Sequence, residues 1–334
     1  MCVIFFYANS NPAPSGYKLI LASNRDESYA RDTLETAKWA NAEHVYGGID
    51  LEPGREGGTW LAVSGHRGVF KVGALLNLTG EPKHKDAFAS PNIIMHSNHN
   101  NNTPDDVGAS LAATTTTTTI HNNHFLLGRG MIVSDFVKSY DDGNTIDEYN
   151  RNLVSDCSKY NAFNFISIEI GASNSPARIA HCTNAPTSCQ TYTEGQCYGF
   201  GNSLPAAPFE KVRFGQQRFQ SIVETFHLQN VNSSKFDSSS KRREEQLVQP
   251  CLELLKCKRK FWPDAELQRR APNWGEELSA LNVIIPHASY GSRTHSVILI
   301  DDNNKLHFYE ETMKGVDPEG KWTTTHIEKQ YFDN

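Results

Sequence analysis

The chain has 334 residues, 38% of them apolar and 21% charged, which is enough to bury a large core and excludes a disordered protein. Its formal net charge of −6 argues against a nucleic-acid partner, and no apolar run approaches the roughly 18 residues of a transmembrane segment. Seven scattered cysteines without a C-x-x-C pair, behind an N-terminus without a basic leader, predict free thiols and a cytoplasmic location.

The first third of the chain predicts β-strands. Short apolar runs at residues 3–8 and 17–23 flank a stretch rich in Asn, Pro and Gly, which is typical of a hairpin with a long loop. Further strands are expected at residues 59–64 and 69–78. The sequence therefore begins as an antiparallel sheet.

A biased tract follows at about residues 90–125. It is dominated by Asn, His and Thr and contains six consecutive threonines. Such a composition cannot form a core, so we expect a disordered loop insertion. The tract contains four histidines that could hold a metal ion: His96, His99, His121 and His124. The biased composition of the tract explains them equally well, so no metal site is expected there.

The remainder alternates groups of helices with groups of strands. Amphipathic spacing predicts helices at residues 130–141, 145–156, 209–227 and 244–258, the second opened by a capping box formed by Thr145 and Glu148. Strands are expected at residues 163–171, 177–182, 294–300, 305–312 and 322–330. Short turns between successive strands imply antiparallel pairing. We therefore predict an α/β fold, an αββα sandwich of two antiparallel sheets covered by helices, as one domain over residues 1–334.

Position 2 carries the most reactive candidate. A cysteine directly after Met1 is small enough for the methionine to be removed, which would give Cys2 a thiol and a free α-amine. The amine has an ordinary pKa of about 8 and can act as a general base for the thiol beside it. A Met-Cys start also arises by chance, so Cys2 alone does not identify an enzyme.

Three polar clusters support a site around Cys2. They are Asn24-Arg25-Asp26-Glu27 after a buried strand, Gly199-Phe200-Gly201-Asn202, and Tyr290-Gly291-Ser292-Arg293. Asp26 could orient an amine, an Asn side chain could donate to an oxyanion, and an arginine could bind a carboxylate. The alternative is that these are ordinary turn residues and solvent-facing arginines.

Four motifs together resemble the transport and Golgi organisation 2 family, whose members are also called NRDE proteins. They are Met1-Cys2-Val3-Ile4-Phe5-Phe6, Leu21-Ala22-Ser23-Asn24-Arg25-Asp26-Glu27, Gly54-Arg55-Glu56-Gly57-Gly58-Thr59-Trp60-Leu61 and Tyr290-Gly291-Ser292-Arg293-Thr294. The resemblance covers the chain except for the Asn/Thr tract. It implies an N-terminal nucleophile (Ntn) hydrolase fold, with roles in haem trafficking, acyl-CoA and lipid metabolism, Golgi organisation and secretion. It also implies cytosolic and mitochondrial locations.

A more distant resemblance links the chain to the bile-salt and penicillin amidases of the Ntn class. Cys2 matches their nucleophile, and Asn24 and Asp26 match an Asn and an Asp spaced two apart. Their oxyanion asparagines and a late arginine correspond to three further positions: Asn77, Asn202 and Arg293. The chain departs from these amidases in one respect, because the arginine that precedes their Asn is here Ser23, and Arg25 follows it instead.

Three functional hypotheses remain. The favoured one is a carrier that holds haem or an acyl-CoA and requires no cofactor of its own. In this hypothesis Arg293 binds an anionic group of the ligand, and His287 and His295 are the best-placed ligands for a haem iron. The second is a Cys2-dependent amidase or thioester hydrolase of the Ntn class. The third is a scaffold peripherally associated with an organelle such as the Golgi apparatus or mitochondrion.

Overall fold

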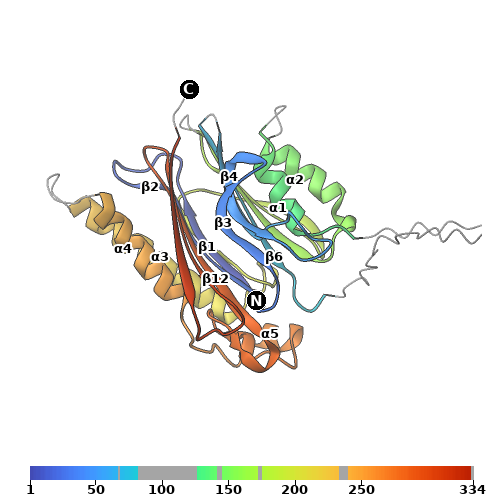
Figure 1. The fold of residues 1–334 in the computed structure, drawn as a ribbon. Helices are drawn as coiled ribbons and strands as arrows, with labels where there is room; N and C mark the ends of the chain where they lie inside the picture. The colour runs from blue at the N-terminus through green and yellow to red at the C-terminus, as the bar shows by residue number, and fades with distance from the viewer. Residues whose placement is uncertain (67, 82–125, 141–144, 172–174, 233–239, 332–334) are drawn as a thin grey trace, which may run out of the picture.

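Two antiparallel sheets, packed face to face and covered on their outer faces by helices, make up the molecule (Figure 1). The computed structural model describes residues 1–66, 68–81, 126–140, 145–171, 175–232 and 240–331. The predicted αββα sandwich is confirmed. The Asn/Thr/His-rich tract expected at about residues 90–125 lies outside the described residues.

The first sheet holds both ends of the described chain, because the second strand of the N-terminal hairpin pairs with the first of three long C-terminal strands. Its strand order is β10-β1-β2-β12-β13-β14, with β11 added to β12. The strands are β1 (Val3–Ala8), β2 (Tyr17–Ser28), β10 (Cys197–Phe200), β11 (Ile284–Ile285), β12 (Tyr290–Asp301), β13 (Lys305–Met313) and β14 (Trp322–Gln330).

The second sheet follows chain order from β3 to β9, so every neighbouring pair in it is also consecutive in sequence. Its strands are β3 (Thr33–Trp39), β4 (Ala42–Asp50), β5 (Leu61–His66), β6 (Val69–Asn77), β7 (Phe163–Ile170), β8 (Arg178–Asn184) and β9 (Thr187–Tyr192). Most of these connections are short and favour antiparallel pairing, whereas the one from β6 to β7 includes α1 (Gly130–Lys138) and α2 (Ile146–Ser155).

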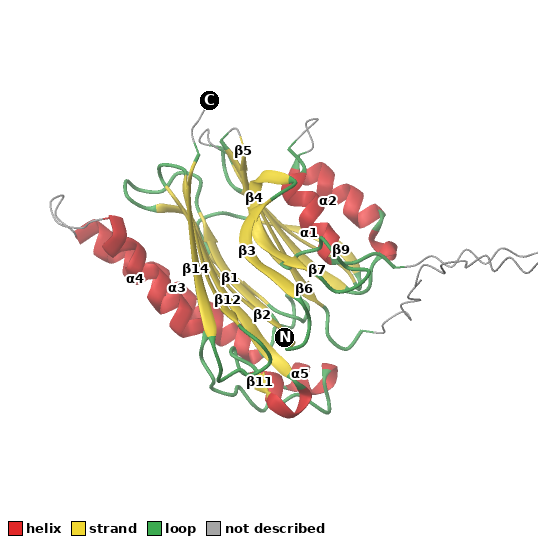
Figure 2. Cartoon of the chain, viewed as in Figure 1, coloured by secondary structure: helices red, strands yellow, loops and turns green. Residues whose placement is uncertain are grey.

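Four of the five α-helices in the described chain cover the two outer faces (Figure 2). Helices α1 (Gly130–Lys138) and α2 (Ile146–Ser155) pack on the second sheet. Helices α3 (Glu210–Asn232) and α4 (Ser240–Leu255) pack on the first, and α5 (Ala265–Arg270) lies at its end. Thr145 is the N-cap of α2, since its side chain accepts a hydrogen bond from the backbone N–H of Glu148, which is one half of the predicted capping box.

Successive side chains of a strand point to opposite faces of its sheet, and the buried apolar side chains form three layers. In β1, Phe5 packs under α3 while Phe6 faces the second sheet. A third layer lies between the second sheet and helices α1 and α2. A strand buried on both faces reads as a continuous apolar run, and each large apolar side chain buried in this way contributes about 1.5–3 kcal/mol.

The sequence located most of the strands and misplaced some bounds. Strand β2 continues five residues beyond the predicted end, through the polar Asn24-Arg25-Asp26-Glu27 cluster, because β12 pairs along its whole length. The sequence does not predict strands β3, β4, β9 and β10 or the two-residue strand β11. The first four carry many exposed or half-buried residues, so their apolar periodicity is weak.

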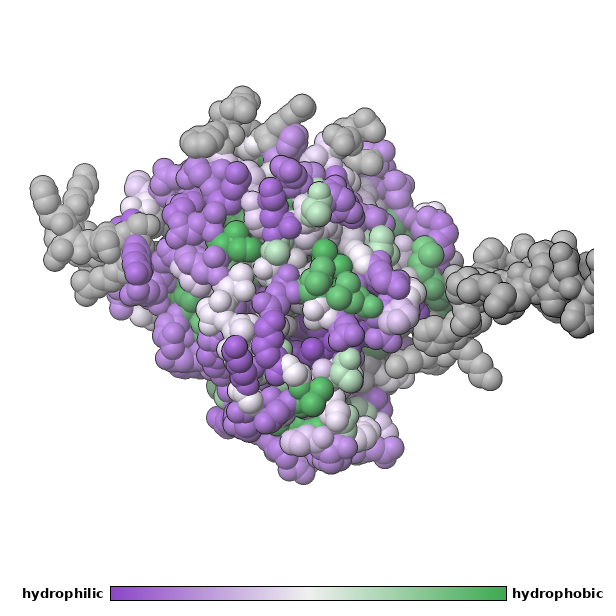
Figure 3. All heavy atoms as spheres, viewed as in Figure 1, coloured by the Kyte–Doolittle hydropathy of each residue, from purple (hydrophilic) through white to green (hydrophobic). Residues whose placement is uncertain are grey.

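The described part of the chain contains no helix long and apolar enough to cross a membrane. On the face shown in Figure 3 the surface is largely hydrophilic, and apolar residues occur there in separate small patches. This face presents no broad apolar area to a partner.

Candidate active site

A pocket of about 230 Å³ opens where the two sheets and the start of α1 meet. Cys2 and Arg25 contribute to it from the first sheet, and Trp60 and Asn77 from the second. Because the N-terminus of the chain enters β1 at this point, the candidate nucleophile lies at the pocket wall. The structure therefore brings together Cys2, Arg25, Asp26 and Asn77 among the predicted site residues.

The Cys2 thiol is held against the backbone of the neighbouring strand. Its Sγ lies 3.3 Å from the backbone nitrogen of Asp26, which donates to it. Burial raises the pKa of the thiol, with the negative charge of Asp26 in the same direction, while the nearby N-terminal amine opposes this shift. The thiol is therefore protonated at neutral pH and needs a base to become a nucleophile.

The α-amine of Met1 forms a buried ion pair with Asp26. Its nitrogen lies 2.8 Å from Oδ2 of Asp26 and donates a hydrogen bond of 2.9 Å to the Tyr290 hydroxyl. The other carboxylate oxygen accepts from Ser292 Oγ at 2.6 Å. Burial lowers the pKa of the amine despite the carboxylate beside it. A lowered pKa favours the neutral amine, which is the form that can accept a proton.

Lys211 completes the polar contacts around the N-terminus, from the first turn of α3. Its fully buried Nζ donates to the carbonyl oxygens of Met1 (3.2 Å) and Ala280 (2.9 Å). Burial lowers the pKa of this ammonium group. Lys211 thus fixes the position of the residue that precedes Cys2.

Arg25 points into the pocket from the face of β2 that lies between the sheets. The residue is 5% exposed, and its guanidinium carbon lies 4.1 Å from the centre of the Trp60 ring. Within the described residues its side chain donates no hydrogen bond, and burial lowers its pKa. Stacking on an aromatic ring orients the cation but leaves its N–H donors available.

The two predicted oxyanion asparagines have different positions. Asn77 ends β6, and its side chain is exposed at the pocket, where it makes no hydrogen bond to any described residue. Asn202 is buried and donates from Nδ2 to the Asn77 carbonyl oxygen at 2.5 Å. Asn77 can therefore contact a ligand, whereas Asn202 positions its backbone.

Asn24 and His295 lie on the opposite face of the first sheet, under the helices. Asn24 Nδ2 donates to the carbonyl oxygens of Leu255 and Leu281, and Oδ1 lies 2.7 Å from His295 Nδ1. The imidazole stacks on Trp322, and burial lowers its pKa to about 4. Both residues lie outside the pocket and anchor α4 and the segment before β11 to the sheet.

The other two predicted ligand residues also lie outside the pocket lining. Arg293 is the extra residue of a β-bulge in β12, and its guanidinium donates to the carbonyl oxygens of Ser28 (3.0 Å) and Arg31. It therefore fixes the turn between β2 and β3. His287 is exposed on a 3₁₀ turn and stacks on Trp274.

Charge at the pocket is balanced. Four arginines line it, and so do four carboxylates: Arg25, Arg31, Arg55, Arg129, Asp26, Glu27, Asp50 and Glu52. Arg31 is neutralised by Asp50 at 2.5 Å. The arrangement suits one carbonyl or carboxylate group beside the thiol better than a polyanion.

Three site residues have no role predicted from the sequence. Trp60 and Ser292 lie in two of the motifs that resemble the family, and of these two motifs only that of Ser292 contains a residue with a predicted role, Arg293. Ser292 pairs directly with Asp26 across β2 and β12, which the sequence alone does not reveal. The sequence could have indicated that Lys211 is buried, because it precedes Gly215 and Phe219 at four-residue spacing on the apolar face of α3.

These features define the protein as an αββα sandwich with a half-buried cysteine before its first strand, at the wall of a pocket between the two sheets. A family model described as Transport and Golgi organisation 2 matches residues 1–315. The Drosophila melanogaster Transport and Golgi organization protein 2 is 53% identical over 331 residues, covering 99% of each chain. Homologues from Mus musculus and Homo sapiens are 28% and 25% identical, over 98% and 95% of each chain respectively. The chain belongs to the Transport and Golgi organisation 2 family.

Proposed function

We propose that this protein binds a small acyl compound, of the acyl-CoA class or a related lipid metabolite, in the pocket beside Cys2. The observation that carries the proposal is the guanidinium of Arg25, which is buried and makes no hydrogen bond within the described residues. Arg25 lines the pocket and none of its N–H groups is among the buried unsatisfied atoms of the described residues, so these donors face the pocket, where a ligand oxygen can accept from them. Asn77 offers a second donor at the same pocket.

The pocket favours an acyl group over haem. Its volume of about 230 Å³ is below the roughly 300–1,000 Å³ of sites that enclose a drug-sized ligand. None of the described lining residues is a histidine, so a haem iron in this pocket would depend on the Cys2 thiolate for its protein ligand. A short acyl chain can enter while the rest of its carrier remains outside.

A second candidate function is hydrolysis, with Cys2 as nucleophile. Its specific support is that the thiol and the Asn77 amide line one pocket while Asp26 holds the N-terminal amine. Hydrolysis of the Met1–Cys2 peptide bond would transfer that role to the amine of Cys2. The amine would take the thiol proton, the thiolate would attack the acyl carbonyl, and the amine or thiol leaving group would depart with the proton. Water would then cleave the S-acyl bond and restore Cys2.

The cellular role is proposed from the relatives. Their names connect them with transport and Golgi organisation. We infer the same role for this chain, exerted by peripheral association with the organelle and through the acyl compound that the pocket holds.

Titration of butyryl-CoA by calorimetry tests the binding proposal. Arg25→Gln should weaken binding about 10- to 100-fold, because charged hydrogen bonds contribute about 1.5–3 kcal/mol. Arg213→Gln removes an exposed arginine paired with Glu210 and is the control. Equal affinity in wild type and Arg25→Gln would remove Arg25 from the site. Tighter binding of ferric haem than of butyryl-CoA, lost in Cys2→Ser, would favour the haem carrier.

Intact-mass analysis after incubation with butyryl-CoA tests the hydrolase candidate. An active enzyme should lack Met1 and gain one butyryl group, and both the adduct and CoA release should disappear in Cys2→Ser. Butyryl-CoA binding should persist in that variant. A retained Met1, or CoA release unchanged in Cys2→Ser, would eliminate Cys2 as the nucleophile.

A further inference from the structure

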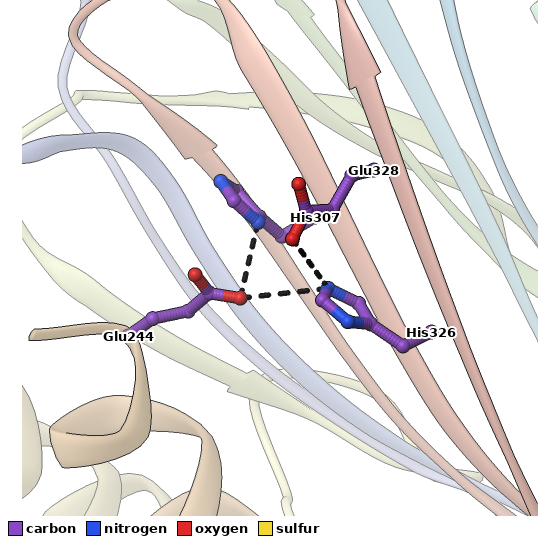
Figure 4. Close-up of side chains that lie close together, drawn as sticks. All are labelled: Glu244, His307, His326 and Glu328. Atoms are coloured by element: carbon purple, nitrogen blue, oxygen red, sulfur yellow. Dashed lines mark ion pairs between the residues drawn. The ribbon is translucent and has the colours of Figure 1, made fainter. Parts of the chain in front are cut away.

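Four potential metal ligands meet on the first sheet, outside the pocket described above (Figure 4). Glu244 comes from the first turns of α4, His307 from β13, and His326 and Glu328 from β14. One ligand atom of each lies within 4.8 Å of those of the other three. Figure 4 shows the four side chains converging from the helix and the two strands.

Three of the separations between ligand atoms are close to those expected around a tetrahedral ion. Glu244 Oε1 lies 3.1 Å from His307 Nδ1 and 3.4 Å from His326 Nε2, and His326 Nε2 lies 3.7 Å from Glu328 Oε1. Zn²⁺ binds nitrogen and oxygen at about 2.0–2.2 Å, which puts neighbouring ligands of a tetrahedron about 3.3 Å apart. Imidazole and carboxylate together suit Zn²⁺ and its transition-metal neighbours.

Two of the ligand atoms are buried without a hydrogen bond. Glu244 Oε1 and His307 Nδ1 are close to each other, yet neither makes a hydrogen bond of acceptable geometry within the described residues. The two residues are 5% and 1% exposed, so water does not readily compensate. Leaving two such atoms unsatisfied is costly, and a cation between them would satisfy both.

The surroundings hold the outer ligands in place. The His326 ring stacks on Tyr309 with centroids 3.8 Å apart, which fixes its orientation. Lys305 Nζ pairs with Glu328 Oε2 at 2.5 Å, so the other carboxylate oxygen remains directed at the cluster. Such supporting contacts are typical of residues that orient metal ligands.

We propose that Glu244, His307, His326 and Glu328 form a Zn²⁺ site that ties the start of α4 to strands β13 and β14. Four protein ligands give a closed, structural site. The ion joins a helix to two strands that are 60 or more residues later in the chain, so its binding stabilises the folded state.

Co²⁺ titration of the metal-free full-length protein, followed by Zn²⁺ displacement, tests the proposal. A tetrahedral nitrogen and oxygen site should give visible cobalt bands without thiolate-to-cobalt charge transfer. To remove competing histidines, the background carries His96, His99, His121 and His124 each changed to Gln. His326→Ala, at the surface, and the isosteric Glu244→Gln should each weaken Zn²⁺ binding at least about tenfold. His287→Ala removes another His–Glu pair and is the control.

A rise in the melting temperature with Zn²⁺, lost in His326→Ala and kept in His287→Ala, would support the structural role. Thiolate charge-transfer bands would assign the metal to cysteines and overturn the proposal. It would equally fail if His326→Ala and Glu244→Gln bound Zn²⁺ as wild type does, or if the wild type bound none.

Discussion

Acidification should destabilise the protein through His295. This imidazole donates from Nδ1 to Asn24 Oδ1 at 2.7 Å and stacks on Trp322 with centroids 5.0 Å apart. Burial lowers its pKa from 6.5 to about 4. The unfolded chain therefore takes up a proton as the pH falls below about 6.5, while the folded chain stays neutral until about pH 4. Stability from this group is present above pH 6.5 and is lost as the pH falls toward 4.

The size of the effect follows from the two pKa values. At pH 5 the unfolded histidine is mostly protonated and the folded one is not, so the free energy of unfolding falls by about 2 kcal/mol relative to pH 7.5. The complete loss below pH 4 is about 3 kcal/mol, at about 1.4 kcal/mol per pKa unit. His181, whose pKa burial also lowers to about 4, adds a similar loss.

Urea unfolding of wild type and His295→Asn at pH 7.5 and pH 5 isolates the contribution of His295. The variant retains an amide that can contact Asn24. Between the two pH values its free energy of unfolding should fall by about 2 kcal/mol less than that of wild type. His287→Asn, at an exposed position, should behave as wild type does. Equal pH dependence in His295→Asn and wild type would refute the assignment of His295 as a neutral structural residue.

Two further substitutions test the packing that positions Asp26. Gly291→Ala should lower the free energy of unfolding by about 1–3 kcal/mol, because a Cβ there would overlap the carbonyl oxygen of Val283. Gly171→Ala is the control, because a Cβ there meets nothing within 4 Å and should change that free energy by less than about 0.5 kcal/mol. Equal losses in thermal unfolding would contradict this reading of β12. Ser292→Ala should cost about 1–3 kcal/mol by removing the 2.6 Å hydrogen bond to Asp26, and urea unfolding within error of wild type would show that water replaces the hydroxyl.

The strands that build the central core could be predicted from the sequence. Residues 3–8 are apolar without interruption, which requires a strand buried on both faces, and the helices that follow show the spacing of a single apolar face. The grouping of these elements then leaves few alternatives to a helix-covered sandwich. Cys2, Arg25, Asp26 and Asn77 could likewise be selected as site candidates, because reactive and charged side chains at strand ends are chemically distinctive.

What the sequence could not decide is which side of a strand each candidate faces and what it contacts. Asn24 and Arg25 are adjacent, yet the first anchors helices and the second lines the pocket, since neighbouring strand residues point to opposite faces. The bulge in β12 directs Arg293 to backbone carbonyls, and register alone pairs Ser292 with Asp26.

The Glu244–His307–His326–Glu328 cluster shows the same limit over a longer range. Its members are separated by up to 84 residues and form no sequence motif. The spacing of apolar residues in a sequence predicts which positions are buried, because buried positions recur at a regular interval along a helix or strand. Convergence of side chains from different elements depends on sheet register and helix packing, and these are set only when the whole chain has folded.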